Sequence, residues 1–234
     1  MKSRLAMPRL VLIDLDGTLV DTLPDLSLCV DRMLAELGIP GVGPERVRAW
    51  VGGGTEALVR RALGWRSDAP PDDDRLAAAQ TIFSRLYAQH TSDRSRVFDG
   101  AQTALDFFHR AGVTLACVTN KAGAFTHKLL ADLGLDRHFA LVVSGDTLAR
   151  KKPDPLPLLH AAEYFHVQPA QTLLVGDSSN DVEAARAAGM NVVCVTYGYN
   201  HGEDIRESAP DALVDSLAEL PQLFARERRA GAAV

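Results

Sequence analysis

The spacing of hydrophobic residues changes twice along the chain. A short apolar run at 10–13 ends in polar residues and predicts a buried strand. Apolar side chains then recur at helical spacing, which predicts helices at 26–37, 47–51, 58–64 and 76–87. From about residue 100 the two patterns alternate. Predicted helices at 102–110, 125–133, 156–166 and 182–188 are each followed by an apolar strand, at 113–118, 141–143, 172–175 and 192–195.

This alternation is typical of the α/β class. Nearly all-apolar strands that alternate with helices indicate a parallel sheet covered on both faces. We therefore predict a doubly wound, mainly parallel, Rossmann-like sheet. Residues 1–19 and 94–234 would form this α/β core, and the all-helical stretch 20–93 would be a cap inserted between its first and second strands. The charged end at 226–234 is typical of a helix end and tail.

Composition and charge narrow the range of partners. Of the 234 residues, 47% are hydrophobic and 24% charged, which is ordinary for a globular protein. The net charge of −5 offers no basic surface to nucleic acid or to an anionic membrane, so neither is expected as a partner. The run at 10–13 is too short for a signal peptide, and we expect a cytoplasmic protein. Cys29, Cys117 and Cys194 form no CxxC pair and are expected to be buried thiols.

Two acids, Asp14 and Asp16, follow the first predicted strand. Residues two apart on an extended backbone point to the same side, so Asp14 can attack a phosphorus atom while Asp16 gives a proton to the departing oxygen. Gly17 permits a sharp turn directly afterwards. The alternative is an Asx turn that ends the strand, with a helix cap at Thr18.

Polar residues also follow the next three strands. Thr119 offers a hydroxyl to a phosphate oxygen, although helix capping is its more common use. Lys152 precedes Pro153 in a stiff turn, so its ammonium can balance phosphoryl oxygens; the alternative is a solvated basic turn. Asp177 and Asp181 supply oxygens that suit Mg²⁺, or else cap the following helix. Because the carboxyl ends of parallel strands meet in one crevice, the four clusters together predict a phosphoryl-transfer site.

These motifs resemble those of the haloacid dehalogenase superfamily of phosphatases. The superfamily's four motifs are matched in order and spacing by DLDGT at 14–18, VTN at 118–120, KPDP at 152–155 and GDSSND at 176–181. The helical insertion resembles the superfamily's C1-type cap. Segments such as VDRMLAELG at 30–38 and TYGYNHG at 196–202 are most similar to the bacterial phosphatases of 2-phosphoglycolate.

The resemblance implies a catalytic role for each matching residue. Asp14 would be the nucleophile and a magnesium ligand. Asp16 would be the general acid and then the general base, with its backbone carbonyl on the metal. Thr119 and Asn120 would bind the phosphate, and Lys152 would neutralise it.

Magnesium is the cofactor that the resemblance implies. Asp177 would ligate the ion directly, and Asp181 would hold a metal-bound water or lie just behind the ligands. In the cap, Gly53 and Gly54 would let a loop approach the substrate, although a flexible turn between helices is the alternative. Gly53 departs from many relatives, which carry asparagine at this position.

The predicted activity is Mg²⁺-dependent hydrolysis of a small phosphorylated metabolite, best 2-phosphoglycolate, through an aspartyl-phosphate. The alternatives are a phosphatase for another small substrate, such as a sugar phosphate or pyrophosphate, and a phosphomutase. The protein is expected to be a monomer or homodimer. Asp16 argues against a dehalogenase or a carbon–phosphorus hydrolase, and residues 20–93 contain no lysine for the imine that the latter needs. A non-enzymatic phospho-acceptor domain would need neither Asp16 at this place nor the cap.

A substrate that carries a carboxylate also requires a cation near the pocket. Most arginines on helices are simply solvated, and His201 is more typical of a surface turn than of the site. The candidate cations are Arg46, Arg48, Arg60, Arg61 and Lys121.

Overall fold

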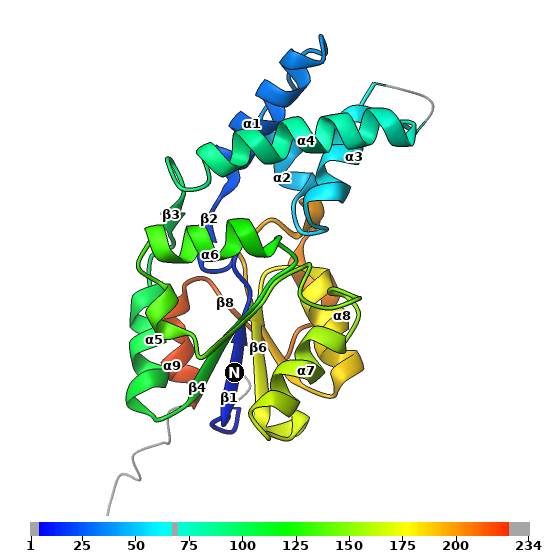
Figure 1. The fold of residues 1–234 in the computed structure, drawn as a ribbon. Helices are drawn as coiled ribbons and strands as arrows, with labels where there is room; N and C mark the ends of the chain where they lie inside the picture. The colour runs from blue at the N-terminus through cyan, green and yellow to red at the C-terminus, as the bar shows by residue number, and fades with distance from the viewer. Residues whose placement is uncertain (1–4, 67–69, 225–234) are drawn as a thin grey trace, which may run out of the picture.

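A six-stranded parallel sheet forms the centre of the computed structural model, which describes residues 5–66 and 70–224 (Figure 1). The strands stand in the order β5-β4-β1-β6-β7-β8. Because β1 pairs with β4 on one side and with β6 on the other, the strand order switches direction at β1, and such a switch leaves a crevice at the carboxyl ends of the strands. The strands are β1 (Leu10–Ile13), β4 (Thr114–Val118), β5 (Leu141–Val143), β6 (Thr172–Gly176), β7 (Asn191–Val195) and β8 (Ala212–Val214).

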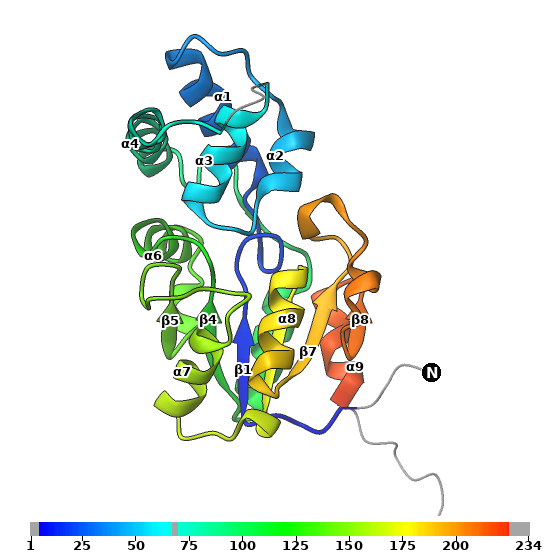
Figure 2. The same cartoon turned by 90° about the vertical axis from the view of Figure 1, so that its right-hand side faces the viewer.

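Helices cover both faces of the sheet. In β1, Val11 and Ile13 contribute to one hydrophobic core, while Leu10 and Leu12 contribute to the other. The first core contains residues of α5, α6 and α9, and the second contains residues of α7 and α8, which lie in front of the sheet in Figure 2. These helices are α5 (Ala101–Arg110), α6 (Gly123–Asp132), α7 (Leu156–Tyr164), α8 (Ser179–Ala188) and α9 (Leu220–Phe224). The doubly wound α/β architecture is therefore confirmed.

Four further helices form a layer over the carboxyl ends of the strands (Figures 1 and 2). This helical layer consists of α1 (Leu23–Glu36), α2 (Pro44–Trp50), α3 (Thr55–Gly64) and α4 (Asp73–Gln89). It has a hydrophobic core of its own, in which Met33, Val59 and Phe83 are buried. At the start of α4, the Asp72 side chain accepts a hydrogen bond from the Arg75 N–H at 2.8 Å, as its acidic start predicts. The division into a core and a separate cap at 20–93 stays a prediction.

Three short strands escaped the sequence pattern. β2 (Val20–Asp21) and β3 (Arg96–Val97) form an antiparallel pair that connects the helical layer to the sheet, so the stretch 20–93, predicted to be all helix, begins with a strand. β8, at the edge of the sheet, was also not predicted. β2 and β3 have only two residues each, too few to show a periodicity. β8 is as long as the predicted β5, but no predicted helix precedes it, so it falls outside the alternation of helices and strands. The predicted helix end and tail at 226–234 lie outside the described residues.

The cysteines are structural, as expected. Cys29, Cys117 and Cys194 are fully buried and free of disulfides. Burial raises the pKa of each thiol, so none is a thiolate nucleophile near neutral pH. Within the described residues, no helix has both the length and the apolar character needed to cross a membrane.

Asp25 joins the two chain segments that run between the layers. Its carboxylate is fully buried at the start of α1. It accepts hydrogen bonds from the N–H groups of Arg94 at 3.0 Å and Ser95 at 2.7 Å, and from the Ser95 hydroxyl at 2.7 Å. Because Arg94 and Ser95 directly precede β3, these bonds hold the entry and the exit of the helical layer together.

Replacing Asp25 tests this connection. Asp25→Ala should lower the free energy of unfolding by roughly 2–4 kcal/mol, because the buried donors of Arg94 and Ser95 lose their acceptor. Asp72→Ala is the control, since it removes an exposed helix cap that contributes about 1 kcal/mol. Urea denaturation followed by circular dichroism measures both losses. A loss for Asp25→Ala no larger than that of the control would contradict the role given to Asp25.

Candidate active site

The polar residues that follow the strands come together at the carboxyl end of the sheet. Asp14 follows β1, Thr119 follows β4 and Asp177 follows β6. Asp181 lies in the first turn of α8, and Lys152 lies in the loop between β5 and α7. All five residues are buried. Side chains that are far apart in the sequence are thus brought together by the switch point at β1.

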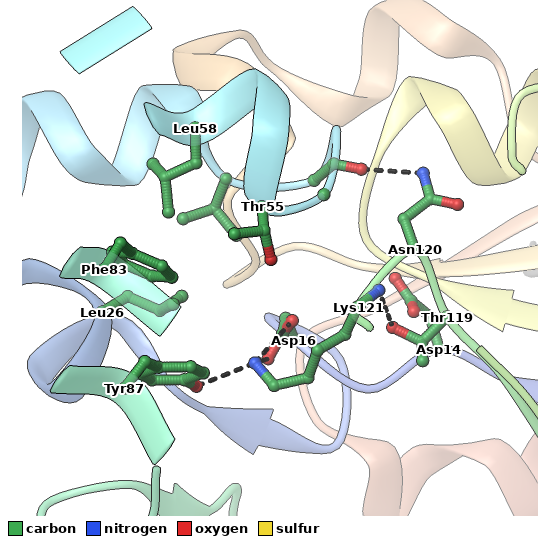
Figure 3. Close-up of a pocket in the computed structure, with 13 residues that line it drawn as sticks. Asp14, Asp16, Leu26, Thr55, Leu58, Phe83, Tyr87, Thr119, Asn120 and Lys121 are labelled. Carbon is green, nitrogen blue, oxygen red and sulfur yellow. Dashed lines mark hydrogen bonds and ion pairs between the residues drawn. The ribbon is translucent and has the colours of Figure 1, made fainter. Parts of the chain in front are cut away.

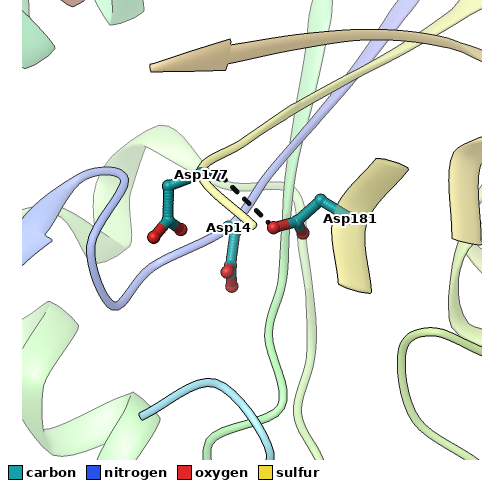
Figure 4. A group of neighbouring side chains, drawn as sticks. All are labelled: Asp14, Asp177 and Asp181. Atoms are coloured by element: carbon teal, nitrogen blue, oxygen red, sulfur yellow. Dashed lines mark hydrogen bonds between the residues drawn. The ribbon is translucent and has the colours of Figure 1, made fainter. Parts of the chain in front are cut away.

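Three carboxylates crowd into one place at this end of the sheet (Figure 4). One oxygen from each of Asp14, Asp177 and Asp181 lies within 4.8 Å of the others. Lys152 Nζ lies 3.0 Å from Asp14 Oδ1 and 2.7 Å from Asp181 Oδ1, and it donates to the Val118 carbonyl at 2.8 Å. When all four groups are ionised, three carboxylates and one ammonium carry a formal charge of −2, so the cluster is short of positive charge.

Hydrogen bonds fix two of these carboxylates. Asp177 accepts from the Thr18 hydroxyl and from the Tyr199 N–H, at 2.8 Å each. Asp181 Oδ2 accepts from the N–H of Ser178 at 3.1 Å and from its hydroxyl at 2.7 Å. The helix-capping alternative for Asp181 is therefore present alongside its place in the acidic cluster.

Glycines make room for the carboxylates. A side chain at Gly198 would overlap that of Asp177, and one at Gly176 would overlap that of Asp181. Gly17 has a φ of +83°, which favours glycine, and a Cβ there would lie 2.5 Å from Asp177 Oδ2. The acidic groups can approach one another only because the surrounding backbone lacks side chains at these positions.

Burial dominates the protonation of the cluster. It raises the pKa of Asp14 from 3.8 to about 6, against the lowering effect of Lys152. The pKa of Asp177 rises to about 8, first through burial and then through repulsion from Asp181 and Asp14. Burial alone would lower the pKa of Lys152. The two neighbouring carboxylates raise this pKa by more than burial lowers it, so the ammonium stays charged.

These features suit a divalent cation. The ligands on offer are carboxylate oxygens, which hard cations prefer. One divalent ion would balance the formal charge of the cluster. Asp14 Oδ1 is buried and, apart from its ion pair with Lys152, has no hydrogen-bond partner among the described residues. The acidic cluster can therefore hold a metal ion.

A pocket lies beside this cluster, between the sheet and the helical layer (Figure 3). Its cavity is about 40 Å³. Asp14 and Asp16 both line it, whereas Lys152, Asp177 and Asp181 do not. The other lining residues are Thr119, Asn120 and Lys121 from the sheet side, and Leu26, Val51, Gly52, Gly54, Thr55, Leu58, Phe83 and Tyr87 from the helical layer.

The two residues expected to bind phosphate are used differently. Thr119 Oγ1 accepts a hydrogen bond from the Lys121 N–H at 3.2 Å, and its hydroxyl hydrogen, for which the described residues provide no acceptor, can donate to a ligand. Asn120 Nδ2 donates to the backbone carbonyls of Gly52 and Lys152, at 2.8 Å each. The side-chain amide of Asn120 therefore connects the helical layer to the loop of Lys152, and its predicted contact with phosphate stays a prediction.

The glycine loop at 52–54 faces the sheet side. Gly52 and Gly54 line the pocket, but Gly53 does not, so its contact with substrate also stays a prediction. Gly54 has a φ of +85°, and a Cβ there would lie 3.0 Å from the Asn120 carbonyl oxygen. This close approach therefore needs glycine. His201, which the sequence placed in a surface turn, is instead half-buried, and its ring would lie 3.0 Å from a Cβ at Gly52.

Asp16 forms an ion pair inside the pocket (Figure 3). Lys121 Nζ lies 3.0 and 3.2 Å from its two carboxylate oxygens and donates to the Tyr87 hydroxyl at 2.8 Å. The sequence suggested Lys121 only as one of several cations, and Tyr87 only as an apolar position of a helix. No local signal could have paired them, because α4 and the loop after β4 meet only in the folded chain.

Tyr199 connects the acidic cluster to the helical layer. Its N–H donates to Asp177, and its hydroxyl donates to Asp21 at 2.8 Å. The same hydroxyl accepts from the N–H groups of Thr22 at 2.9 Å and Leu23 at 3.1 Å. The sequence showed Tyr199 only as part of the segment 196–202, and its spacing gave no sign of this role.

Comparison with known proteins finds relatives over nearly the whole chain. The model of the haloacid dehalogenase-like hydrolase family matches residues 11–195. A phosphoglycolate phosphatase of Nitrosococcus oceani is 49% identical over 222 residues, covering 95% of this chain and 99% of the relative. One from Thiobacillus denitrificans is 50% identical over 209 residues, covering 89% and 92%. A crystal structure of a predicted phosphoglycolate phosphatase from Haemophilus somnus has a TM-score of 0.89 and 33% identity, covering 94% of this chain and 99% of the other.

The chain therefore belongs to the haloacid dehalogenase-like hydrolase family, as its four motifs predicted. The matched region runs from β1 to β7 and contains every residue of the acidic cluster. Within the family, this chain is an enzyme of the phosphatase class.

The crowded carboxylates predict a pH-dependent response to metal. A pKa raised by folding stabilises the protein at low pH, and this contribution is lost as pH rises through the folded pKa values, about 6 for Asp14 and about 8 for Asp177. In EDTA, the thermal midpoint should therefore fall by roughly 10 °C between pH 5.5 and pH 8.5. Added Mg²⁺ should raise the midpoint more at pH 8.5, because protons compete for the ligands at lower pH. Differential scanning calorimetry measures both effects.

Asp177→Asn is the control for this pH series. The amide cannot titrate, so most of the fall in EDTA and most of the Mg²⁺ effect should disappear. An equal rise with Mg²⁺ at both pH values in the unmodified protein would contradict the assignment.

Proposed function

We propose that this protein is a Mg²⁺-dependent phosphomonoester hydrolase that forms an aspartyl-phosphate on Asp14, and that its substrate is 2-phosphoglycolate. The observation that carries the proposal is the position of Asp14 between the acidic cluster and the pocket. The carboxylate of Asp14 lies close to Asp177, Asp181 and Lys152. The same residue lines the cavity beside Asp16. A phosphoryl group in the pocket would therefore meet a nucleophile and a proton donor together.

The reaction would proceed in two displacements. A carboxylate oxygen of Asp14 attacks phosphorus, the bond from phosphorus to the ester oxygen breaks, and Asp16 gives its proton to that oxygen. Asp16, now ionised, then takes a proton from a water molecule that attacks the aspartyl-phosphate. The bond between phosphorus and Asp14 breaks, inorganic phosphate leaves, and both carboxyl groups return to their starting states.

The buried residues around Asp14 would support these steps. Mg²⁺, held by Asp14, Asp177 and the backbone carbonyl of Asp16 with Asp181 nearby, would offset the repulsion between the nucleophile and an anionic phosphate. Lys152 keeps its positive charge 3.0 Å from Asp14, so it would neutralise charge on the phosphoryl oxygens. The Thr119 hydroxyl would donate to one of these oxygens.

The volume of the pocket favours a small substrate. Its cavity of about 40 Å³ is little larger than a few water molecules, each of which needs roughly 10–15 Å³. The relatives at 49% and 50% identity are phosphoglycolate phosphatases. The helical layer would act as the cap of this site and exclude bulk water from the reaction.

Replacing the nucleophile tests the covalent mechanism. Asp14→Asn should lower kcat by about 10⁴-fold or more, because the amide cannot form the phosphorylated intermediate. The thermal midpoint in EDTA should not fall, since the substitution removes one charge from a cluster of formal charge −2. Phosphate release and calorimetry measure the two effects. An active Asp14→Asn variant would refute the nucleophile.

A panel of substrates tests the narrower proposal. The kcat/KM for phosphate release should be at least roughly 10-fold higher for 2-phosphoglycolate than for glucose 6-phosphate, ethyl phosphate or pyrophosphate, because only the first combines small size with a carboxylate. Equal values would end the substrate assignment and leave the phosphatase mechanism standing. Isomerised phosphate esters without free phosphate would instead indicate a phosphomutase.

A further inference from the structure

Lys121 is the one cation among the residues that line the pocket. Of the candidates from the sequence, only Lys121 lines the cavity. Arg46 lies over the Trp65 ring at 3.9 Å, and Arg48 donates to the Tyr197 carbonyl at 2.8 Å. The remaining candidates are engaged on the surface: Arg60 with Glu56 and Arg61 with the Trp50 carbonyl.

Lys121 is held in place rather than solvated. Only 5% of the residue is exposed. Its Nζ donates to Tyr87 Oη at 2.8 Å and lies 4.6 Å from the centre of the same ring. With Asp16 at 3.0 Å, the ammonium has one carboxylate partner inside the pocket. The described residues provide no acceptor for the Tyr87 hydroxyl hydrogen, so this group remains able to donate to a ligand.

Asp16 already pairs with Lys121, the cation that the carboxylate of an acidic substrate would need. In 2-phosphoglycolate the carboxylate stands one carbon from the ester oxygen, and that oxygen must face Asp16 if Asp16 is its proton donor. The substrate carboxylate therefore comes close to Lys121 as well. An ammonium that binds both oxygens of Asp16 keeps this side chain turned toward itself and away from the ester oxygen.

We propose that Lys121 is the specificity residue for the substrate carboxylate, and that it exchanges Asp16 for that carboxylate when substrate binds. The Tyr87 hydroxyl supplies a second hydrogen bond to the same carboxylate. Once released from the ammonium, Asp16 takes up a proton from water, turns to the ester oxygen and can then serve as its proton donor. This inference rests on the proposed phosphatase mechanism and adds the chemical basis on which the enzyme selects its substrate. An ester without a carboxylate binds while Asp16 is still paired with Lys121. Selection therefore affects kcat as well as KM.

The test compares 2-phosphoglycolate with its amide, 2-phosphoglycolamide, which has nearly the same shape and no carboxylate charge. In the unmodified enzyme, kcat/KM should be about 100-fold higher for the acid, with part of the difference in kcat. In Lys121→Gln the ratio should fall below about 5-fold. Lys121→Arg, which keeps the charge, should retain a ratio of at least about 10-fold.

Two further variants separate this role from a structural one. Tyr87→Phe keeps the ammonium and removes one hydroxyl, so the ratio should fall by only about 5- to 10-fold. Lys128→Gln removes an exposed lysine that pairs with Asp132 on α6, and it should leave the ratio unchanged. Thermal midpoints measured for each variant show that the ratios come from folded protein.

The possible results separate the two proposals. A ratio that stays near 100-fold in Lys121→Gln, or an equal loss for both compounds, would overturn the role of Lys121 while the phosphatase mechanism stands. Lower activity on the acid through KM alone, with kcat unchanged, would overturn the exchange with Asp16. An unmodified enzyme that releases phosphate from neither compound would overturn the proposed substrate and the role of Lys121 together.

Discussion

The repulsion among three buried carboxylates is the constraint on which the site depends. Asp14, Asp177 and Asp181 lie within reach of one ion, and a single ammonium, that of Lys152, accompanies them. Burial strengthens each interaction because the surrounding dielectric is low. The sheet supplies the rigidity that keeps these groups together: Asp14 and Asp177 follow adjacent strands, β1 and β6, whose register is fixed by hydrogen bonds. A flexible loop would relieve the repulsion by moving apart.

A second set of charges lies on the other side of the nucleophile, in the pocket under the helical layer, and it too comes from loops that follow strands of the sheet. Lys121 and Asp16 form a neutral pair in the pocket, in contrast to the charge-deficient cluster behind Asp14. The two sets have different chemistry. The acidic cluster suits a metal ion, whereas the pocket pair offers one ammonium to an anionic group of a ligand. Asp14 stands between them, and Asp16 belongs to the pocket set.

The fold and the acidic cluster could be predicted from the sequence because both follow from local rules. Apolar runs that alternate with helices predict a parallel sheet, and the carboxyl ends of parallel strands must converge. That reasoning brought Asp14, Asp177, Asp181 and Lys152 together before any coordinates, although their catalytic roles remain proposals. β2 was not predicted because two residues are too few to show a pattern, and β8 was not predicted because no predicted helix precedes it.

Contacts between the layers could not be predicted in this way. Tyr87 reads as one more apolar residue of α4, and its hydroxyl meets Lys121 only because the helix lies over the end of β4. Tyr199 likewise reaches α1 from a loop far along the chain. The phosphate contact of Asn120 stays a prediction, and the hydrogen bond from its amide to the glycine loop could not be foreseen, because it depends on where that loop lies in space.

The hydrogen bonds of Tyr199 limit how the helical layer can move. Its hydroxyl bonds the first residues of that layer, close to the β2–β3 pair where the chain crosses between layers. A rotation that preserves these bonds must take place about an axis near Tyr199. The contacts between the layers that lie away from this crossing include those of Gly52 with Asn120 and of Tyr87 with Lys121. The helical layer is thus joined to the sheet near Tyr199 by the chain and by hydrogen bonds, whereas over the pocket it is joined by hydrogen bonds alone.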